Sequence, residues 1–253
     1  MPSYKGMIPG VFTAANVVCG FLALLSVIEG ELITACWFVV LAAFLDGLDG
    51  KVARLSGIAS QFGVELDSLA DFLSFGVTPA VLIHAGEMDS IGRWGWVVAI
   101  VYIMAAAYRL ARYNLMVDTE EKQNFVGLPV PAAALALTGY VIFSDYLWGG
   151  LRHDQILVGI VVVCAFLMVS QVEYDVPPDR LDGPYRWHKA GLLAVASVAL
   201  LIYPRLLLFP YTVLYILSGL VREAWHMFTP GAGRTTGAPP PNGSAGQRTE
   251  YGG

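Results

Sequence analysis

Four aspartates stand at regular spacing in an otherwise apolar part of the chain, and their side chains are the best suited to chemistry. Asp46 and Asp49 are three residues apart, and Asp67 and Asp71 are four residues apart. Residues at these separations lie on one face of a helix, so each pair directs both carboxylates the same way. A break at residues 56–57 permits an antiparallel turn, which would bring the two pairs face to face.

Four like charges within a membrane need a counter-charge. One carboxylate in a membrane-spanning helix costs roughly 2.5–3.5 kcal/mol, and neighbouring like charges add repulsion. Divalent cations remove this cost, and oxygen ligands in this number suit Mg²⁺ or Mn²⁺. Two ions sharing the carboxylates would hold a pyrophosphate, with space beside them at Gly50 and Ala53. A single pair in a soluble protein would more simply be a solvated helix face, but the apolar context and the second pair favour a metal site.

The spacing of these residues also resembles the signature of a known family, the CDP-alcohol phosphatidyltransferases. All eight fixed positions agree: Asp46, Asp49, Gly50, Ala53, Arg54, Gly63, Asp67 and Asp71. The resemblance implies that the four aspartates hold two divalent cations on the pyrophosphate of CDP-diacylglycerol, and that Asp71 is the catalytic base. It further implies a CDP-diacylglycerol site made by Gly50, Ala53, Arg54, Ser60 and Gly63.

Composition places the chain in a membrane. Hydrophobic residues make up 56% of the sequence and charged residues only 14%, with a mean hydropathy of +0.61. Soluble domains carry about 25% charged residues. We therefore expect an all-α integral membrane protein. No basic stripe is present, so nucleic-acid binding is not expected. The cysteines, which share no metal-ligand spacing, are interpreted as small packing residues: Cys19, Cys36 and Cys164.

About eight transmembrane helices are predicted, since eight apolar segments approach the roughly 20 residues that span a bilayer. These segments are 8–28, 32–54, 63–86, 92–116, 127–147, 154–173, 188–205 and 207–225. Gly76 and Pro79 predict a local kink in the third, with a freed carbonyl that a neighbouring helix has to satisfy. Residues 1–228 are expected to form one catalytic membrane domain. The Gly- and Pro-rich tail, residues 229–253, is expected to be disordered.

The distribution of positive charge predicts the orientation. If the helix ends carrying Asp49 and Asp67 face the cytoplasm, only Arg93, Arg152 and Arg205 of the fifteen Lys and Arg lie on the opposite side. This asymmetry agrees with the positive-inside rule. We therefore expect a multi-pass protein of a bacterial-type inner membrane, with its active site facing the cytoplasm. No cleavable signal peptide is expected.

Polar residues in two further segments are candidates for the site. Thr13 and Asn16 in the first apolar segment either join helices or line the site, and the sequence leaves both interpretations open. Arg109 and Arg112 share a helix face near the end of the fourth segment. They are either cations reaching the membrane surface or ligands for a carboxylate or phosphate, and Asn114 is placed to join them.

Three runs are similar to one subgroup of the family, the serine-using phosphatidyltransferases of bacteria. These runs are LDSLADFLSFGVTPA at 66–80, RLARYN at 109–114 and FVGLPVPAA at 125–133. The resemblance implies transfer of a phosphatidyl group from CDP-diacylglycerol to the hydroxyl of L-serine, with phosphatidylserine and CMP as products. It makes Arg109, Arg112 and Asn114 candidate serine-binding residues and implies a homodimer surrounded by membrane lipids.

Other acceptors remain open at this point. Glycerol 3-phosphate or inositol phosphate would need cations near the metals, a role that Arg109 and Arg112 would fill. Choline would need an aromatic cage, for which Tyr108 and Tyr113 are weak candidates. An ion transporter would place its carboxylates at the membrane midplane within an inverted repeat, whereas these lie near helix ends and no repeat is visible. A purely structural membrane protein would have no need for buried acids.

Overall fold

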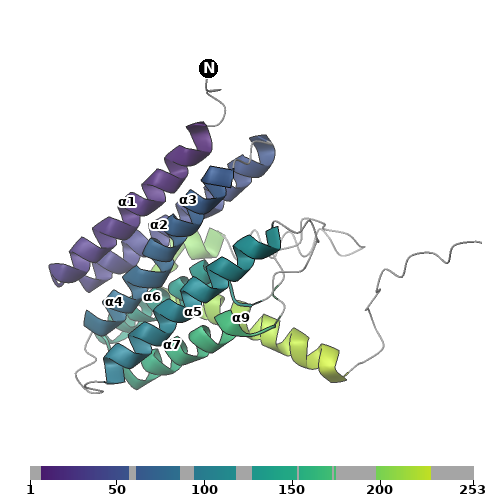
Figure 1. Ribbon diagram of the computed structural model, residues 1–253. Helices are drawn as coiled ribbons and strands as arrows, with labels where there is room; N and C mark the ends of the chain where they lie inside the picture. The colour runs from purple at the N-terminus through teal and green to yellow at the C-terminus, as the bar shows by residue number, and fades with distance from the viewer. Residues whose placement is uncertain are drawn as a thin grey trace, which may run out of the picture.

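The computed structural model describes residues 7–56, 61–85, 94–117, 127–152, 154–172, 174 and 198–228, and every regular element among them is helical (Figure 1). The predicted all-α fold is therefore confirmed. In chain order the helices are α1 (Met7–Ile28), α2 (Leu32–Ser56), α3 (Gln61–Asp71), the π-helix η2 (Phe72–Val77), α4 (Thr78–Ala85), α5 (Trp94–Val117), α6 (Val130–Trp148), α7 (Asp154–Val169) and α9 (Pro204–Phe228).

Six helical stretches among the described residues are long and apolar enough to cross a membrane, and the chain is an integral membrane protein. They are Gly10–Ile28, Leu32–Val52, Phe62–Ala85, Trp94–Leu115, Val130–Trp148 and Pro204–Trp225. These correspond to six of the eight predicted segments, and a seventh forms the shorter apolar helix Gln155–Val169. Most of segment 188–205 and all of the tail 229–253 lie outside the described residues, so the expectations for them remain predictions.

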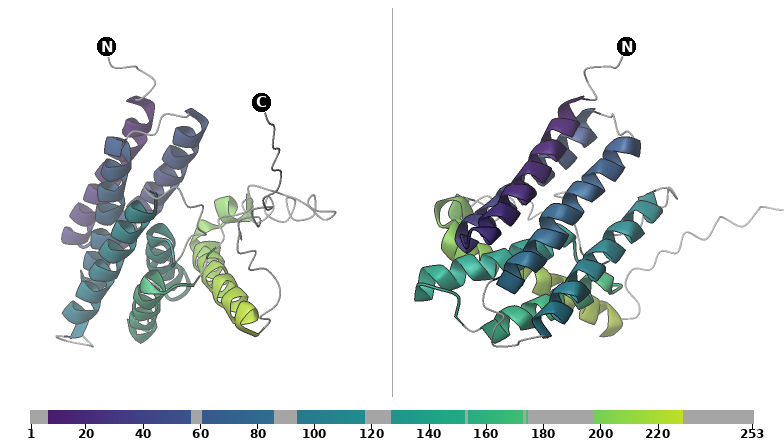
Figure 2. Two further views of the ribbon diagram at one scale, coloured as in Figure 1. Left: turned by 45° about the vertical axis from the view of Figure 1, so that its right-hand side comes forward. Right: turned by 60° about the vertical axis from the view of Figure 1, so that its left-hand side comes forward.

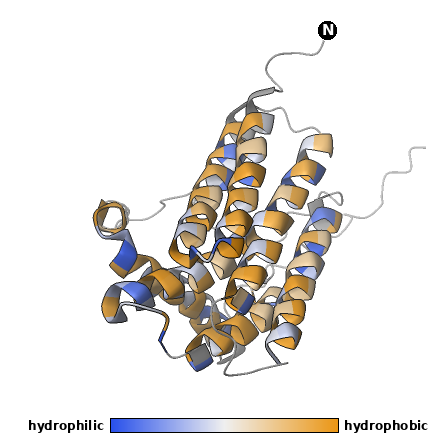
Figure 3. Cartoon of the chain, turned by 90° about the vertical axis from the view of Figure 1, so that its left-hand side faces the viewer, coloured by the Kyte–Doolittle hydropathy of each residue, from blue (hydrophilic) through white to orange (hydrophobic). Residues whose placement is uncertain are grey.

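Hydrophobic residues predominate along the helices (Figure 3), and many large apolar side chains are exposed on their outside. Phe21, Phe44, Met104, Phe166 and Leu214 are all exposed, at 55% to 74% of their surface. In a soluble protein so much exposed apolar surface would drive association, whereas it is the expected surface of helices that face lipid.

The helices form two groups that meet along α5 and α6. In the first group α1 packs along α2 and along the continuous stretch α3–η2–α4. The second group joins α7 to α5 and α9 to α6, with α9 on the side away from α1 (Figure 2). A side chain at Gly139 of α6 would lie 3.3 Å from the backbone nitrogen of Phe209, so this glycine lets α9 approach closely. Helix α6 is thus the central support of the molecule.

A π-helix follows the last of the four aspartates directly. The N–H of Thr78 bonds to the carbonyl of Leu73, five residues earlier, which widens the turn by one residue. Pro79 has no N–H to offer the carbonyl four residues before it, that of Phe75. The hydroxyl of Tyr102 on α5 donates to this carbonyl at 3.0 Å. A neighbouring helix therefore satisfies the carbonyl, as the Gly76–Pro79 pattern predicted, within a π-helical turn.

Candidate active site

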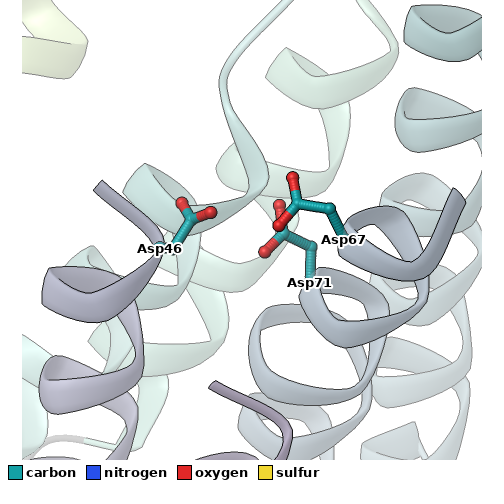
Figure 4. Close-up of side chains that lie close together, drawn as sticks. All are labelled: Asp46, Asp67 and Asp71. Atoms are coloured by element: carbon teal, nitrogen blue, oxygen red, sulfur yellow. The ribbon is translucent and has the colours of Figure 1, made fainter. Parts of the chain in front are cut away.

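Three of the four predicted aspartates converge where α2 faces α3. Helix α2 supplies Asp46, and α3 supplies Asp67 and Asp71 from successive turns. One carboxylate oxygen from each lies within 4.8 Å of the other two. Figure 4 shows Asp46 reaching across from α2 toward Asp67 and Asp71. The helical spacing thus places both acidic faces against each other, as the sequence predicted.

The fourth aspartate, Asp49, lies one turn further along α2 and is 6% exposed. Its Oδ2 accepts a hydrogen bond of 2.5 Å from Oγ1 of Thr13 on α1. Its charge is close enough to those of Asp46 and Asp67 for the three to repel one another. Asp49 therefore belongs to the same acidic cluster but is held from the side of α1.

Asp71 is also held by α1. Asn16, which is fully buried, donates from Nδ2 to Oδ1 of Asp71 at 3.2 Å. Asp71 also lies within electrostatic reach of Arg109 on α5. Asp71 is therefore bonded to α1 and feels a positive charge from α5.

Several buried oxygens in this cluster have no hydrogen-bond donor among the described residues. They are Oδ1 of Asn16, Oδ1 of Asp49 and Oδ1 of Asp67. Burying an acceptor without a donor costs roughly 1–3 kcal/mol, and more when the acceptor is charged. A divalent cation satisfies such oxygens and neutralises the carboxylates at once, and hard oxygen donors are the ligands that Mg²⁺ and Mn²⁺ prefer. The residues present therefore fit a divalent cation.

The predicted CDP-diacylglycerol residues are only partly described. A Cβ added at Gly50 would meet nothing within 4 Å, which agrees with the expectation of space beside the aspartates. Gly63 lies at the start of α3 and is partly buried. Ala53 and Arg54 continue α2, but their side chains lie outside the described part of the structure, as does the whole of Ser60.

The three predicted serine-binding residues have different surroundings on α5. Arg109 is 6% exposed, lies near Asp71, and places its guanidinium 5.4 Å from the centre of the Tyr113 ring. Its buried Nε has no hydrogen-bond partner among the described residues. Asn114 accepts a hydrogen bond of 3.0 Å from Ser68 of α3. These two residues therefore face the acidic cluster or its supporting helix.

Arg112 points to a different place. Its guanidinium donates to the carbonyl oxygens of Val169 and Ser170 at 3.3–3.4 Å, at the end of α7. The last carbonyls of a helix lack intrahelical donors and carry partial negative charge, so a cation stabilises them. Gly127 makes room for this contact, since a Cβ there would lie 2.7 Å from Nη2 of Arg112. Arg112 thus fastens α7 to α5.

Aromatic residues bring α9 close to Arg109. Tyr215 lies within electrostatic reach of Arg109, and its ring centre is 5.8 Å from that of Tyr174. A Cβ added at Gly219 would collide with the Tyr174 ring, so the glycine lets α9 pack against this tyrosine. Burial, with a smaller effect of Tyr215, raises the pKa of Tyr174 to about 12, so its phenol stays neutral.

Thr13 and Asn16 are the site residues whose role the sequence left undecided. The structure places both on aspartates, although they also join helices. Their separation of three residues, which puts them on one face of an apolar helix, was the available signal. Tyr215 had no comparable signal, because it lies more than a hundred residues beyond Arg109 in an aromatic-rich segment.

The sequence profile described as CDP-alcohol phosphatidyltransferase matches residues 6–171, which include all four aspartates and both arginines of α5. The chain belongs to the CDP-alcohol phosphatidyltransferase family. It is 33% identical over 221 residues to the CDP-diacylglycerol–serine O-phosphatidyltransferase of Helicobacter pylori J99, covering 85% of this chain and 90% of that protein. With the Mycobacterium bovis protein of the same name the identity is 31%, covering 83% and 76%.

An archaeal protein is similar as well. The archaetidylserine synthase of Methanothermobacter thermautotrophicus is 33% identical over 178 residues, which cover 70% of this chain and 71% of that protein. Membership of this family, together with the six membrane-spanning helical stretches, makes the protein a membrane-embedded transferase of phospholipid synthesis.

Proposed function

We propose that this phosphatidyltransferase uses L-serine as its acceptor and converts CDP-diacylglycerol to phosphatidylserine and CMP. The observation that carries the chemistry is the convergence of Asp46, Asp67 and Asp71 with buried oxygens that lack donors. Support for the acceptor comes from relatives, since the bacterial proteins named as serine phosphatidyltransferases match over 83% to 85% of this chain.

We assign two divalent cations, Mg²⁺ or Mn²⁺, to the four aspartates. When bound, such cations neutralise the pyrophosphate and stabilise the departing CMP. Asp46 and Asp67 present oxygens toward each other from facing helices, and Asp49 and Asp67 each keep a buried oxygen without a donor.

Asp71 is assigned as the base. The serine hydroxyl oxygen forms a bond to the phosphorus of the phosphatidyl group, and the bond from that phosphorus to the bridging oxygen breaks. CMP leaves with the electron pair of the broken bond, and the hydroxyl proton passes to Asp71.

Arg109 is the side chain best placed for the serine carboxylate. It is buried within electrostatic reach of Asp71, and its Nε has no partner among the described residues. A guanidinium binds a carboxylate through paired hydrogen bonds, which would hold the serine hydroxyl near the base. Arg112 and Asn114, also on α5, support this site through hydrogen bonds to the end of α7 and to Ser68 of α3. A phosphorylated acceptor is less well served, because Arg112 is engaged with the carbonyls of α7.

The remaining assignments follow the family pattern. Gly50, Ala53, Arg54, Ser60 and Gly63 are assigned to the CDP group, and the open space beside Gly50 is consistent with this. The site is assigned to the cytoplasmic face of a bacterial-type inner membrane because of the distribution of Lys and Arg. We also propose a homodimer within the membrane lipids.

A parallel acceptor assay tests the function. The purified protein in detergent is given CDP-diacylglycerol and Mn²⁺ or Mg²⁺, with serine, glycerol 3-phosphate, inositol phosphate or choline, and both CMP and lipid product are measured. We expect CMP and phosphatidylserine with serine alone. Turnover with another alcohol would overturn the serine assignment while keeping the transferase chemistry. The absence of CMP with every acceptor, in protein shown to be folded, would overturn the proposal.

A further inference from the structure

Helix α1 has no charged residue, yet it contacts two of the four aspartates. Oγ1 of Thr13 donates to Asp49, and Nδ2 of Asn16 donates to Asp71. Both α1 residues are buried, at 4% and 0% exposure. Since they are three residues apart, they lie on one face of α1 and reach aspartates on two different helices, α2 and α3.

Each bond engages one oxygen of its carboxylate. The terminal torsion of an aspartate is broad, so an unrestrained carboxylate samples many orientations. A hydrogen bond to one oxygen restricts this rotation and leaves the second oxygen for another partner. For Asp49 that second oxygen, Oδ1, is buried and has no donor among the described residues.

The chemical nature of the two donors matters as much as their position. A lysine or arginine in their place would form an ion pair and compete with a cation for the carboxylate. A hydroxyl and an amide orient the carboxylate without adding positive charge, so its full negative charge stays available. Removing a partner that holds a metal-binding side chain in this way typically lowers the metal affinity 10–100-fold.

A close contact holds α1 against the helix that carries Asp71. Oγ of Ser74 donates to the carbonyl of Asn16 at 3.1 Å. A Cβ added at Gly20 would overlap Oγ of Ser74 and lie 3.1 Å from its Cα. Small residues at such contacts let membrane helices approach closely. Asn16 is thereby fixed through both its backbone and its side chain.

We propose that Thr13 and Asn16 are positioning residues, which hold Asp49 and Asp71 so that their remaining oxygens face a bound divalent cation. Helix α1 is then a third wall of the site beside α2 and α3. The proposal rests on the metal assignment of the proposed function, but it concerns residues that the eight-position signature does not contain.

Metal binding without substrate tests this directly. The full-length protein in detergent is titrated with Mn²⁺, and free Mn²⁺ is followed by electron paramagnetic resonance. We expect Thr13→Val and Asn16→Leu each to weaken Mn²⁺ binding 10–100-fold. Thr13→Ser keeps the hydroxyl and should bind within about threefold of the unmodified protein, on the same reasoning. Thr138→Val is the matched control, because this buried hydroxyl donates within α6 to Ala134 and should leave binding unchanged.

The outcomes separate the two proposals. Folded Thr13→Val and Asn16→Leu proteins that bind Mn²⁺ as tightly as the unmodified protein would overturn the positioning role. Loss of binding in Thr13→Ser equal to that in Thr13→Val would overturn it too, since the hydroxyl would then be irrelevant. If Thr13→Val does not fold, Thr13→Ala carries the same test without β-branching. Failure of the unmodified protein to bind Mn²⁺ would instead overturn the metal assignment.

Discussion

Buried polar side chains occur both in α6 and around the aspartates, but around the aspartates some buried oxygens have no donor among the described residues. In α6 the hydroxyls of Thr138 and Ser144 donate to the carbonyls of Ala134 and Gly150 at 2.8 and 2.9 Å. Around the aspartates acceptors outnumber donors, and Oδ1 of both Asp49 and Asp67 has none among the described residues. The polar side chains of α6 therefore need no further partner, whereas the acidic cluster has oxygens that fit a divalent cation.

The largest effect is expected from removing Asp71, the carboxylate proposed as the base. Asp71→Asn should lower turnover about 10²- to 10⁴-fold, the usual contribution of a general base, with a smaller effect on CDP-diacylglycerol binding. CMP release and binding of the lipid nucleotide measure the two effects. Thr138→Val, the α6 counterpart, should leave both unchanged. Equal losses of binding and turnover in Asp71→Asn would leave this residue as a ligand only.

The next largest effect is expected from removing the metal, which should affect the acidic cluster but not α6. Chelation should stop turnover, and restored Mn²⁺ at a hundred times its dissociation constant should stabilise the protein by about 2.7 kcal/mol. Without metal, Asp67→Asn should melt at a higher temperature than the unmodified protein, because it relieves repulsion among buried like charges. The same variant should lose the response to Mn²⁺. A lower metal-free melting temperature would contradict the view that the empty cluster is strained by its charges.

Two glycines of α1, Gly20 and Gly10, test the close packing of this helix against Ser74. Gly20→Ala should destabilise the protein by about 1–3 kcal/mol, because the new methyl overlaps Ser74 and the core tolerates little added volume. It should also weaken Mn²⁺ binding, since it displaces the helix that carries Thr13 and Asn16. Gly10→Ala on the same helix meets nothing within 4 Å and should be neutral or slightly stabilising. Thermal unfolding and Mn²⁺ titration of both variants check this, and equal behaviour would rule out the close contact.

The smallest effect on stability and Mn²⁺ binding is expected from a substitution in α6. Thr138→Val should change the stability by no more than about 1 kcal/mol, because the carbonyl it leaves is also part of the helix backbone. Its Mn²⁺ affinity should match that of the unmodified protein. A metal-binding defect in Thr138→Val equal to that in Thr13→Val would erase the distinction between scaffold and site.

The sequence by itself determined the membrane class, the all-helical fold and the acidic pairs. Apolar length is a local property, and residues three or four apart share a helix face whatever surrounds the helix. Spacing therefore put Asp67 and Asp71 on one helix face, and the break at residues 56–57 predicted that this face meets Asp46. The carbonyl freed near Pro79 could be predicted in the same local way.

Only the tertiary structure decided which helices complete the site. Thr13 meets Asp49 across 36 residues of sequence, and Asn16 meets Asp71 across 55. The same holds for Arg112, whose contact at the end of α7 lies 57 and 58 residues away. Helical spacing tells which residues share a face but not what that face meets. That choice depends on how neighbouring surfaces fit, as Gly20 fits against Ser74, and on which buried oxygens still lack a donor once the helices have packed.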